Sequence, residues 1–100
     1  MNAAIFGDLD ALAALCQRHG IRRLALFGST LKGSARPDSD VDLLVEFAPG
    51  RTPGLLAIAE IERELSTLLG GRRVDLRTAQ DLSPHFRDDI VRTAEVQYAA

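Results

Sequence analysis

The pattern of apolar and polar positions along the chain predicts helices alternating with short strands. Apolar residues recur at helical spacing over residues 8–19, and Gly20 follows as a natural stop, so this stretch predicts a first helix. A continuous apolar run at residues 24–27 predicts a short strand buried on both faces. Residues 41–47 place Val41, Leu43, Val45 and Phe47 on one side, which predicts a second strand with one apolar face.

The second half of the chain predicts another helix and another strand. Thr52-Pro53 predicts the start of a helix, because threonine caps helix N-termini and proline suits the first turn. Its apolar positions continue at helical spacing to the glycine pair at 70–71. Residues 72–77 predict a third strand. Its polar face carries Arg73, Asp75 and Arg77, and we expect the two arginines to be solvated charges.

The remaining segments complete the predicted topology. Ser83-Pro84 starts a last helix, and residues 28–34 predict a turn that can contain a short helix before a loop at 35–39. The apolar side of that last helix carries Phe86, Ile90, Val91 and Ala94. The expected order is α-β-(α)-β-α-β-α. It predicts an α/β (α+β) fold, a small mixed sheet with helices packed on it, as one domain over residues 1–100.

Composition narrows the class of protein. Of the 100 residues, 46% are hydrophobic and 26% are charged, which excludes a disordered chain. The net charge of −2 gives no general reason to bind nucleic acid. Cys16 is the only cysteine, so no disulfide can form within the chain, which favours a reducing compartment. We see neither a signal peptide nor an apolar run long enough to span a bilayer, and we expect a cytoplasmic protein.

Two carboxylates on one strand are the first candidate for chemistry. Asp40 and Asp42 are two residues apart, so both point to the same face. Two negative charges this close repel each other and raise each other's pKa unless a cation lies between them. Mg²⁺ typically takes one or two carboxylates together with substrate phosphates, so this pair suits Mg²⁺. Asp75, on a later strand, can hold a second metal ion or accept a proton.

Gly28-Ser29, directly after the first strand, supplies the other half of the predicted site. Glycine lets the backbone turn sharply and approach a ligand closely. If Ser29 opens a short helix, its free N–H groups form a site for phosphate. One ligand can touch both Ser29 and the acidic pair only if the end of the first strand lies beside the start of the second, and adjacent antiparallel strands meet that requirement.

These motifs resemble a known family. Gly28-Ser29, ten intervening residues, Asp40-Val41-Asp42 and a later Asp75 are similar to the DNA polymerase beta-type nucleotidyltransferase superfamily. The stretch from Phe27 to Val45 is closest to its minimal nucleotidyltransferase branch, whose members are often paired as antitoxins with small helical HEPN-domain toxins.

The resemblance implies a nucleotidyltransferase core and assigns roles to residues. Gly28 and Ser29 would bind the triphosphate of ATP or another NTP, and Asp40, Asp42 and Asp75 would hold Mg²⁺, with two ions expected. Lys32 stands where many members have arginine; it can neutralise phosphate but cannot form a bidentate contact. The implied reaction transfers a nucleotidyl group, AMP in the first instance, to a hydroxyl of a HEPN-type partner.

The same residues allow other interpretations. A Walker A loop is excluded, because Ser34 and Ala35 stand where Lys and Ser/Thr are required, and an EF-hand is excluded by Leu43 at its essential glycine position. Gly28-Ser29 alone is an ordinary turn. Two alternatives to a protein-modifying enzyme stay open: an antitoxin that binds nucleotide without catalysis and neutralises its partner by complex formation, and an aminoglycoside-type enzyme acting on a small molecule.

Overall fold

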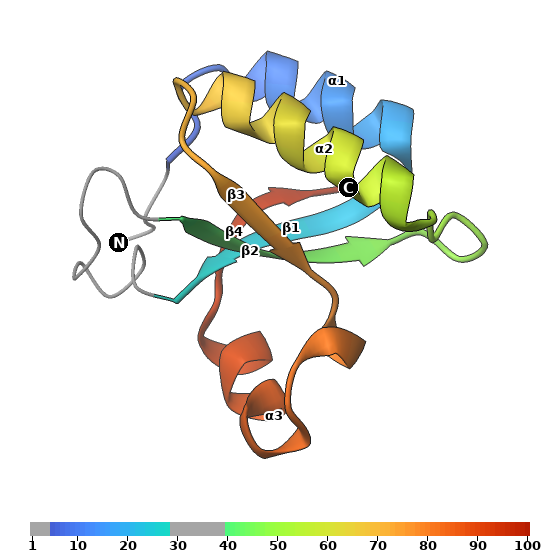
Figure 1. Ribbon diagram of the computed structural model, residues 1–100, viewed down its shortest axis with the longest axis vertical. Helices are drawn as coiled ribbons and strands as arrows, with labels where there is room; N and C mark the ends of the chain where they lie inside the picture. Colours follow the sequence, from blue (N-terminus) through green and yellow to red (C-terminus); the bar gives the residue numbers. More distant parts are fainter. Residues whose placement is uncertain (1–4, 29–39) are drawn as a thin grey trace.

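The computed structural model describes residues 5–28 and 40–100 as a sheet with two helices on one face and a third beyond the other (Figure 1). In chain order the elements are α1 (Leu9–His19), β1 (Ile21–Phe27), β2 (Val41–Phe47), α2 (Leu55–Leu68), β3 (Val74–Arg77), the short 3-10 helix η1 (Ala79–Asp81), α3 (Pro84–Thr93) and β4 (Glu95–Ala99). None of the described helices is long and apolar enough to cross a membrane.

The sheet has four strands in the order β3-β2-β1-β4. β1 pairs antiparallel with both β2 and β4, whereas β2 pairs parallel with β3. The predicted mixed sheet is therefore confirmed, and so is the antiparallel pairing of the first two predicted strands. Residues 29–39 lie outside the part of the chain that the structure describes. The short helix allowed within residues 28–34 and the loop predicted at 35–39 therefore stay predictions.

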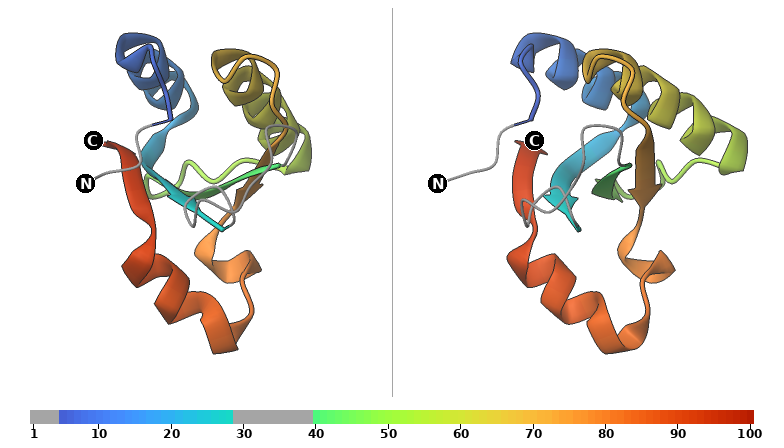
Figure 2. Two further views of the ribbon diagram at one scale, coloured as in Figure 1. Left: turned by 90° about the vertical axis from the view of Figure 1, so that its left-hand side faces the viewer. Right: turned by 60° about the vertical axis from the view of Figure 1, so that its left-hand side comes forward.

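The core lies between one face of the sheet and the layer formed by α1 and α2 (Figure 2). The sheet contributes Leu24, Leu26, Val41, Leu43 and Val45 to it, and the helices contribute Leu12, Leu15, Cys16, Ile61 and Leu65. The apolar face predicted for β2 is the buried one. Burial raises the pKa of the Cys16 thiol to about 12, so Cys16 acts as a small hydrophobic residue.

Three predicted boundaries were wrong. β1 begins at Ile21 and not at residue 24, because the strand continues past Arg22 and Arg23, which interrupt the apolar run, and pairs with β2 through a register shift between Ile21 and Arg23. α2 begins at Leu55, with Gly54 and not Thr52 at the N-cap. Glycine is among the residues favoured at an N-cap, although it has no side chain to accept a hydrogen bond from the first turn. β3 begins at Val74, two residues later than predicted.

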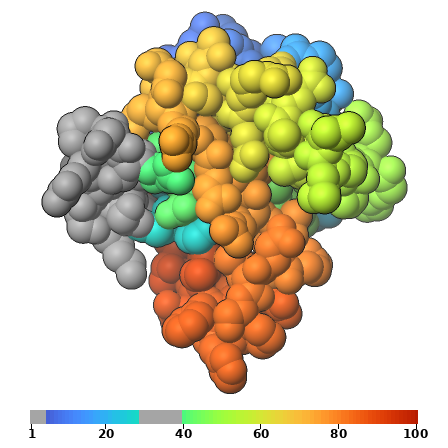
Figure 3. All heavy atoms as spheres, viewed as in Figure 1, coloured from blue at the N-terminus to red at the C-terminus, as the bar shows by residue number. Residues whose placement is uncertain are grey.

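The C-terminal segment departs furthest from the predicted order. After α3 the chain forms β4, which pairs with β1, and Ala94 follows α3 as its cap. The predicted cap Ser83 and first-turn proline are confirmed, since the Ser83 side chain accepts a bond from the His85 N–H. The apolar side predicted for α3 is not packed into a core: none of its residues is buried, and Phe86 is 64% exposed. Figure 3 shows why, because η1 and α3 lie at the opposite end of the molecule from α1 and α2.

A cluster of three charged or titratable side chains links α1 to α2. Glu64 of α2 accepts a bond from Arg18 and lies 2.7 Å from His19 Nε2, both at the C-terminal end of α1. Partial burial acts to raise the pKa of Glu64, but the hydrogen bonds and charges of His19 and Arg18 together outweigh it and hold the pKa below its ordinary value. The position of His19 at a helix end followed from the predicted helix; its acidic partner did not.

Glu64→Gln is expected to lower the free energy of unfolding by about 0.5–1 kcal/mol near neutral pH, the range for partly exposed ion pairs. A carboxyl with a lowered folded pKa contributes stability above its unfolded pKa, here 4.5, and loses it as pH falls through the folded pKa. The difference between variant and wild type should therefore vanish in acid. Urea unfolding across pH measures it, and Glu60→Gln, an exposed position one turn earlier, is the matched control. Equal losses of unfolding free energy in the two variants would contradict a stabilising interaction of Glu64 with Arg18 and His19.

Candidate active site

The sheet brings together three of the predicted site positions at one edge of its open face. β1 ends at Phe27, which pairs with Asp42 at the start of β2, and Asp42 pairs in turn with Asp75 on β3. Asp40 immediately precedes β2 and is exposed. Two predicted positions, Ser29 and Lys32, lie outside the described residues. Gly28, Asp42 and Asp75 therefore become neighbours because of the strand order.

Gly28 touches the carboxylate of Asp42 directly. Its φ is +81°, a backbone conformation in which side chains other than glycine are strained. A Cβ placed on Gly28 would lie 3.0 Å from Asp42 Cγ and closer still to Asp42 Oδ2, nearer than any real contact permits. Both the turn and the close approach thus require glycine here, and the Gly28 backbone forms one wall around the Asp42 carboxylate.

Negative charges surround Asp42. Burial, the charge of Asp75 and the charge of Asp40, in that order, raise the pKa of Asp42, and Arg77 opposes them. The predicted repulsion between the acidic residues is therefore present at Asp42. Such a carboxylate is stabilised by any cation that binds beside it.

Asp75 is held by Arg77, which was expected to be a solvated charge. Arg77 Nε donates to both oxygens of Asp75, at 3.2 and 3.3 Å, and Arg77 Nη2 donates to Oδ2 at 3.1 Å. Both side chains remain partly exposed. The signal for this pairing was the two-residue spacing on one strand, which places both side chains on the same face.

The carboxylates of Asp40, Asp42 and Asp75 fit a small, hard divalent cation only in part. Within residues 5–28 and 40–100, no three His, Cys, Asp or Glu side chains converge in a way that could hold a metal ion. Asp75 is turned toward Arg77, and Asp40 stands at the exposed start of the strand. Mg²⁺ nevertheless needs only one or two carboxylates when phosphates and waters supply its other oxygens, and Asp40 and Asp42 meet that requirement.

An open groove of about 500 Å³ runs from the acidic residues to the outer edge of the sheet. It is lined by Asp40, Glu62, Arg63, Ser66, Arg73, Val74 and Asp75. Glu62 also accepts a bond from the Leu76 N–H at 2.8 Å, which occupies a backbone donor on the edge strand β3. The groove carries both signs of charge, so it suits polar or ionic groups and not an apolar ring.

Comparison with known proteins defines the class of this site. Residues 10–96 match the family described as the nucleotidyltransferase domain. The chain therefore belongs to the nucleotidyltransferase domain family and is an enzyme of that class. The resemblance to this superfamily, which rested on Gly28-Ser29, Asp40-Val41-Asp42 and Asp75, is confirmed at the level of the family.

Two relatives narrow the comparison to the minimal branch of the family, and a third shares the fold. The chain is 42% identical over 84 residues to the protein adenylyltransferase MntA of Thermococcus cleftensis, covering 84% of this chain and 80% of the relative. It is 45% identical to a solved minimal nucleotidyltransferase, with a TM-score of 0.68 over 86% of this chain and 85% of the other. A complex of a tri-AMPylated HEPN toxin with its minimal nucleotidyltransferase antitoxin, from Shewanella oneidensis, shares the fold, at 21% identity and a TM-score of 0.62 over 92% and 70% of the two chains.

Proposed function

We propose that this chain transfers AMP from ATP to a hydroxyl group of a protein partner. The observation that carries the proposal is the arrangement around Asp42, which lies against the Gly28 backbone on an open sheet face and feels the charges of Asp40 and Asp75. In the reaction, the acceptor oxygen forms a bond to the α-phosphorus of ATP. The bond between the α-phosphorus and its bridging oxygen breaks, and pyrophosphate leaves. Asp75 takes the proton of the acceptor hydroxyl.

Asp40 and Asp42, joined by Asp75, are the residues that would hold Mg²⁺, and we expect two ions. When bound, the ions would neutralise charge on the phosphates during transfer. The backbone of Gly28 lies beside Asp42 and would bind the triphosphate together with Ser29 and Lys32, which carry the same role by resemblance. Arg77 fixes the orientation of the Asp75 carboxylate beside Asp42.

We infer that the partner is a small helical HEPN-type protein in the cytoplasm, and that this chain is its antitoxin. The open groove beside Asp40 and Asp75 leaves the acidic residues accessible to a folded protein. A nucleophile presented by such a partner arrives already oriented, which removes much of the entropic barrier. Two relatives support this choice, since one is described as a protein adenylyltransferase and another stands in complex with an AMPylated HEPN toxin.

Incubation of the HEPN-type partner with this chain, Mg²⁺ and ATP is expected to add AMP to the partner, which intact-mass spectrometry detects. Asp75→Asn should abolish the added mass, because the residue that accepts the proton is lost. Asp88→Asn, the same chemical change at an exposed position of α3, should leave it intact.

A different result would select the alternative function. If the partner is bound and neutralised but gains no mass with the wild-type chain, the protein neutralises by complex formation and the catalytic proposal fails.

A further inference from the structure

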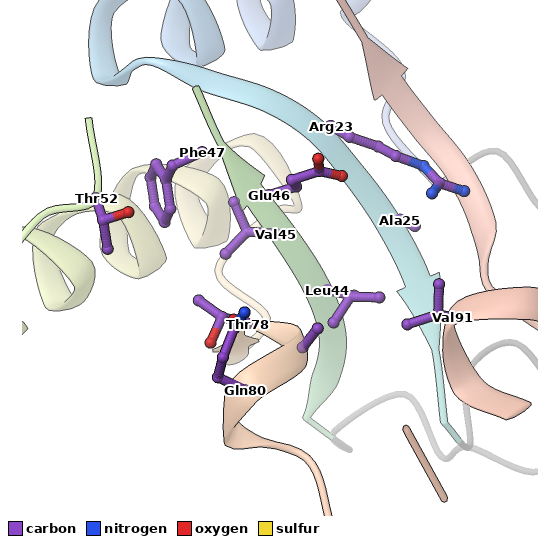
Figure 4. A pocket seen from close by; sticks show the side chains of 11 residues that line it. Arg23, Ala25, Leu44, Val45, Glu46, Phe47, Thr52, Thr78, Gln80 and Val91 are labelled. Atoms are coloured by element: carbon purple, nitrogen blue, oxygen red, sulfur yellow. The ribbon is translucent and has the colours of Figure 1, made fainter. Parts of the chain in front are cut away.

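A second hollow, of about 550 Å³, lies on the same open face of the sheet as the acidic residues (Figure 4). Its floor includes Ala25 of β1 and Leu44 of β2. Thr78 and Gln80, from η1 and the residue before it, form one wall, and Val91 of α3 extends toward Leu44 from the other side. Of these residues only Leu44 lies within the stretch that resembles the family, and none belongs to the acidic site.

The strand register places this hollow one step beyond the acidic residues. Phe27, Asp42 and Asp75 form one row across β1, β2 and β3, and Leu44 and its partner Ala25 lie in the next row on the same face. Because a strand rises about 3.3 Å per residue, Leu44 lies roughly 7 Å from Asp42 along β2. A nucleotide whose α-phosphate meets Asp42 can therefore reach the hollow with its base.

The lining of the hollow suits a planar ring with polar edges. Ala25, Leu44 and Val91 offer apolar surface for the faces of a ring. Hydroxyl, amide and charged groups surround that surface. They belong to Thr52, Thr78, Gln80, Arg23 and Glu46. The groove on the other side of the acidic residues is lined mainly by charged side chains and offers no such apolar surface.

We propose that this hollow binds the nucleobase of the nucleoside triphosphate, with Val91 and Leu44 against the faces of the ring. The inference rests on the proposed nucleotidyl transfer and adds to it the place where the base is held. It places the base beside α3 and the phosphates at the acidic residues on the open face of the sheet, while the groove for polar groups lies between β3 and α2.

Calorimetry with two probes, Mg-ATP and Mg-tripolyphosphate, separates the base from the phosphates. Wild-type protein should bind ATP more tightly than tripolyphosphate. Val91→Trp and Gln80→Trp, which fill the hollow from opposite walls, should each weaken ATP binding by about tenfold, a change worth about 1.4 kcal/mol, and leave tripolyphosphate binding unchanged. Arg92→Trp, next to Val91 but pointing to solvent, should bind both probes like the wild type.

Several results would overturn the inference, and they are distinguishable from failure of the proposed function. Equal wild-type affinity for the two probes, or unchanged ATP affinity in both filled variants, would overturn the base site while transfer activity could stand. Unchanged ATP affinity together with lost transfer to the partner would assign the hollow to the acceptor. Wild-type protein that binds neither probe would overturn the proposed function and the base site together. Circular dichroism of each variant confirms folding, and Gln80, an exposed residue, provides the variant with the smaller risk to folding.

Discussion

Asp42→Asn is expected to reduce nucleotidyl transfer by about two to three orders of magnitude, the size typical of losing one group that stabilises charge in a transition state. Asp42 is the carboxylate that Asp40, Asp75 and the Gly28 backbone surround, so its replacement removes the centre of the site. The measurement is transfer of label from radioactive ATP to the partner. Asp88→Asn is the matched control, and retention of near-wild-type transfer by Asp42→Asn would refute the assignment of the site.

The same variant should be more stable than the wild type when no metal or nucleotide is present. Because the folded pKa of Asp42 lies above its unfolded value of 3.8, the folded state holds this proton more tightly than the unfolded state does. The wild-type free energy of unfolding therefore contains a contribution that is lost as pH rises through the folded pKa. The uncharged amide of the variant avoids that loss, so the variant should gain stability near neutral pH and the gain should shrink in acid. Thermal melts at several pH values test this, and a constant difference would contradict the electrostatic origin.

Gly28→Ala is expected to lower both stability and transfer. The positive φ strains any other residue, at a cost of about 1–3 kcal/mol, and the new methyl group would also displace the Asp42 carboxylate, which occupies the space that the methyl group needs. Gly50→Ala separates the two effects. Gly50 has a φ of +76°, but a Cβ there would meet nothing within 4 Å.

The two glycine variants should therefore lose similar amounts of stability from backbone strain, but only Gly28→Ala should lose most of its transfer activity. Urea unfolding and the transfer assay, run on both proteins, make the comparison. If transfer falls equally in both, strain and not contact with Asp42 explains the loss.

Much of the fold followed from periodicity, and the exceptions have physical reasons. Alternation identified β2 because its buried and exposed faces differ in composition. β4 was not predicted, because Val96 and Tyr98 are the only two residues that show an alternating pattern there. They also follow directly after a segment with helical spacing. The exposure of α3 also could not be predicted, since helical spacing indicates an amphipathic helix but not whether a partner surface of the chain lies beneath it.

The site was predictable to the extent that strand geometry determines it. The spacing of Asp40 and Asp42 gave a common face, and the requirement for antiparallel neighbours gave the proximity of Gly28. The two-residue spacing placed Arg77 and Asp75 on one face, but the bond between them also depends on side-chain conformation, which the spacing does not determine. The hollow beside Leu44 depends on where η1 and α3 stand relative to the sheet, and no local pattern gives that placement.

The position of β4 has a consequence for the newly made chain. β4 pairs with β1 along residues 23–26, and at the same edge of the sheet the Ile5 N–H donates to the Gln97 side chain at 3.1 Å. At roughly 5–20 residues per second, a ribosome needs several seconds for the about 70 residues that separate β1 from β4. Through that interval one edge of β1 has no partner in its own chain, and an unpaired edge readily pairs with other chains. The order of strands therefore leaves this edge of β1 open to pairing with other chains until residues 95–99 leave the ribosome.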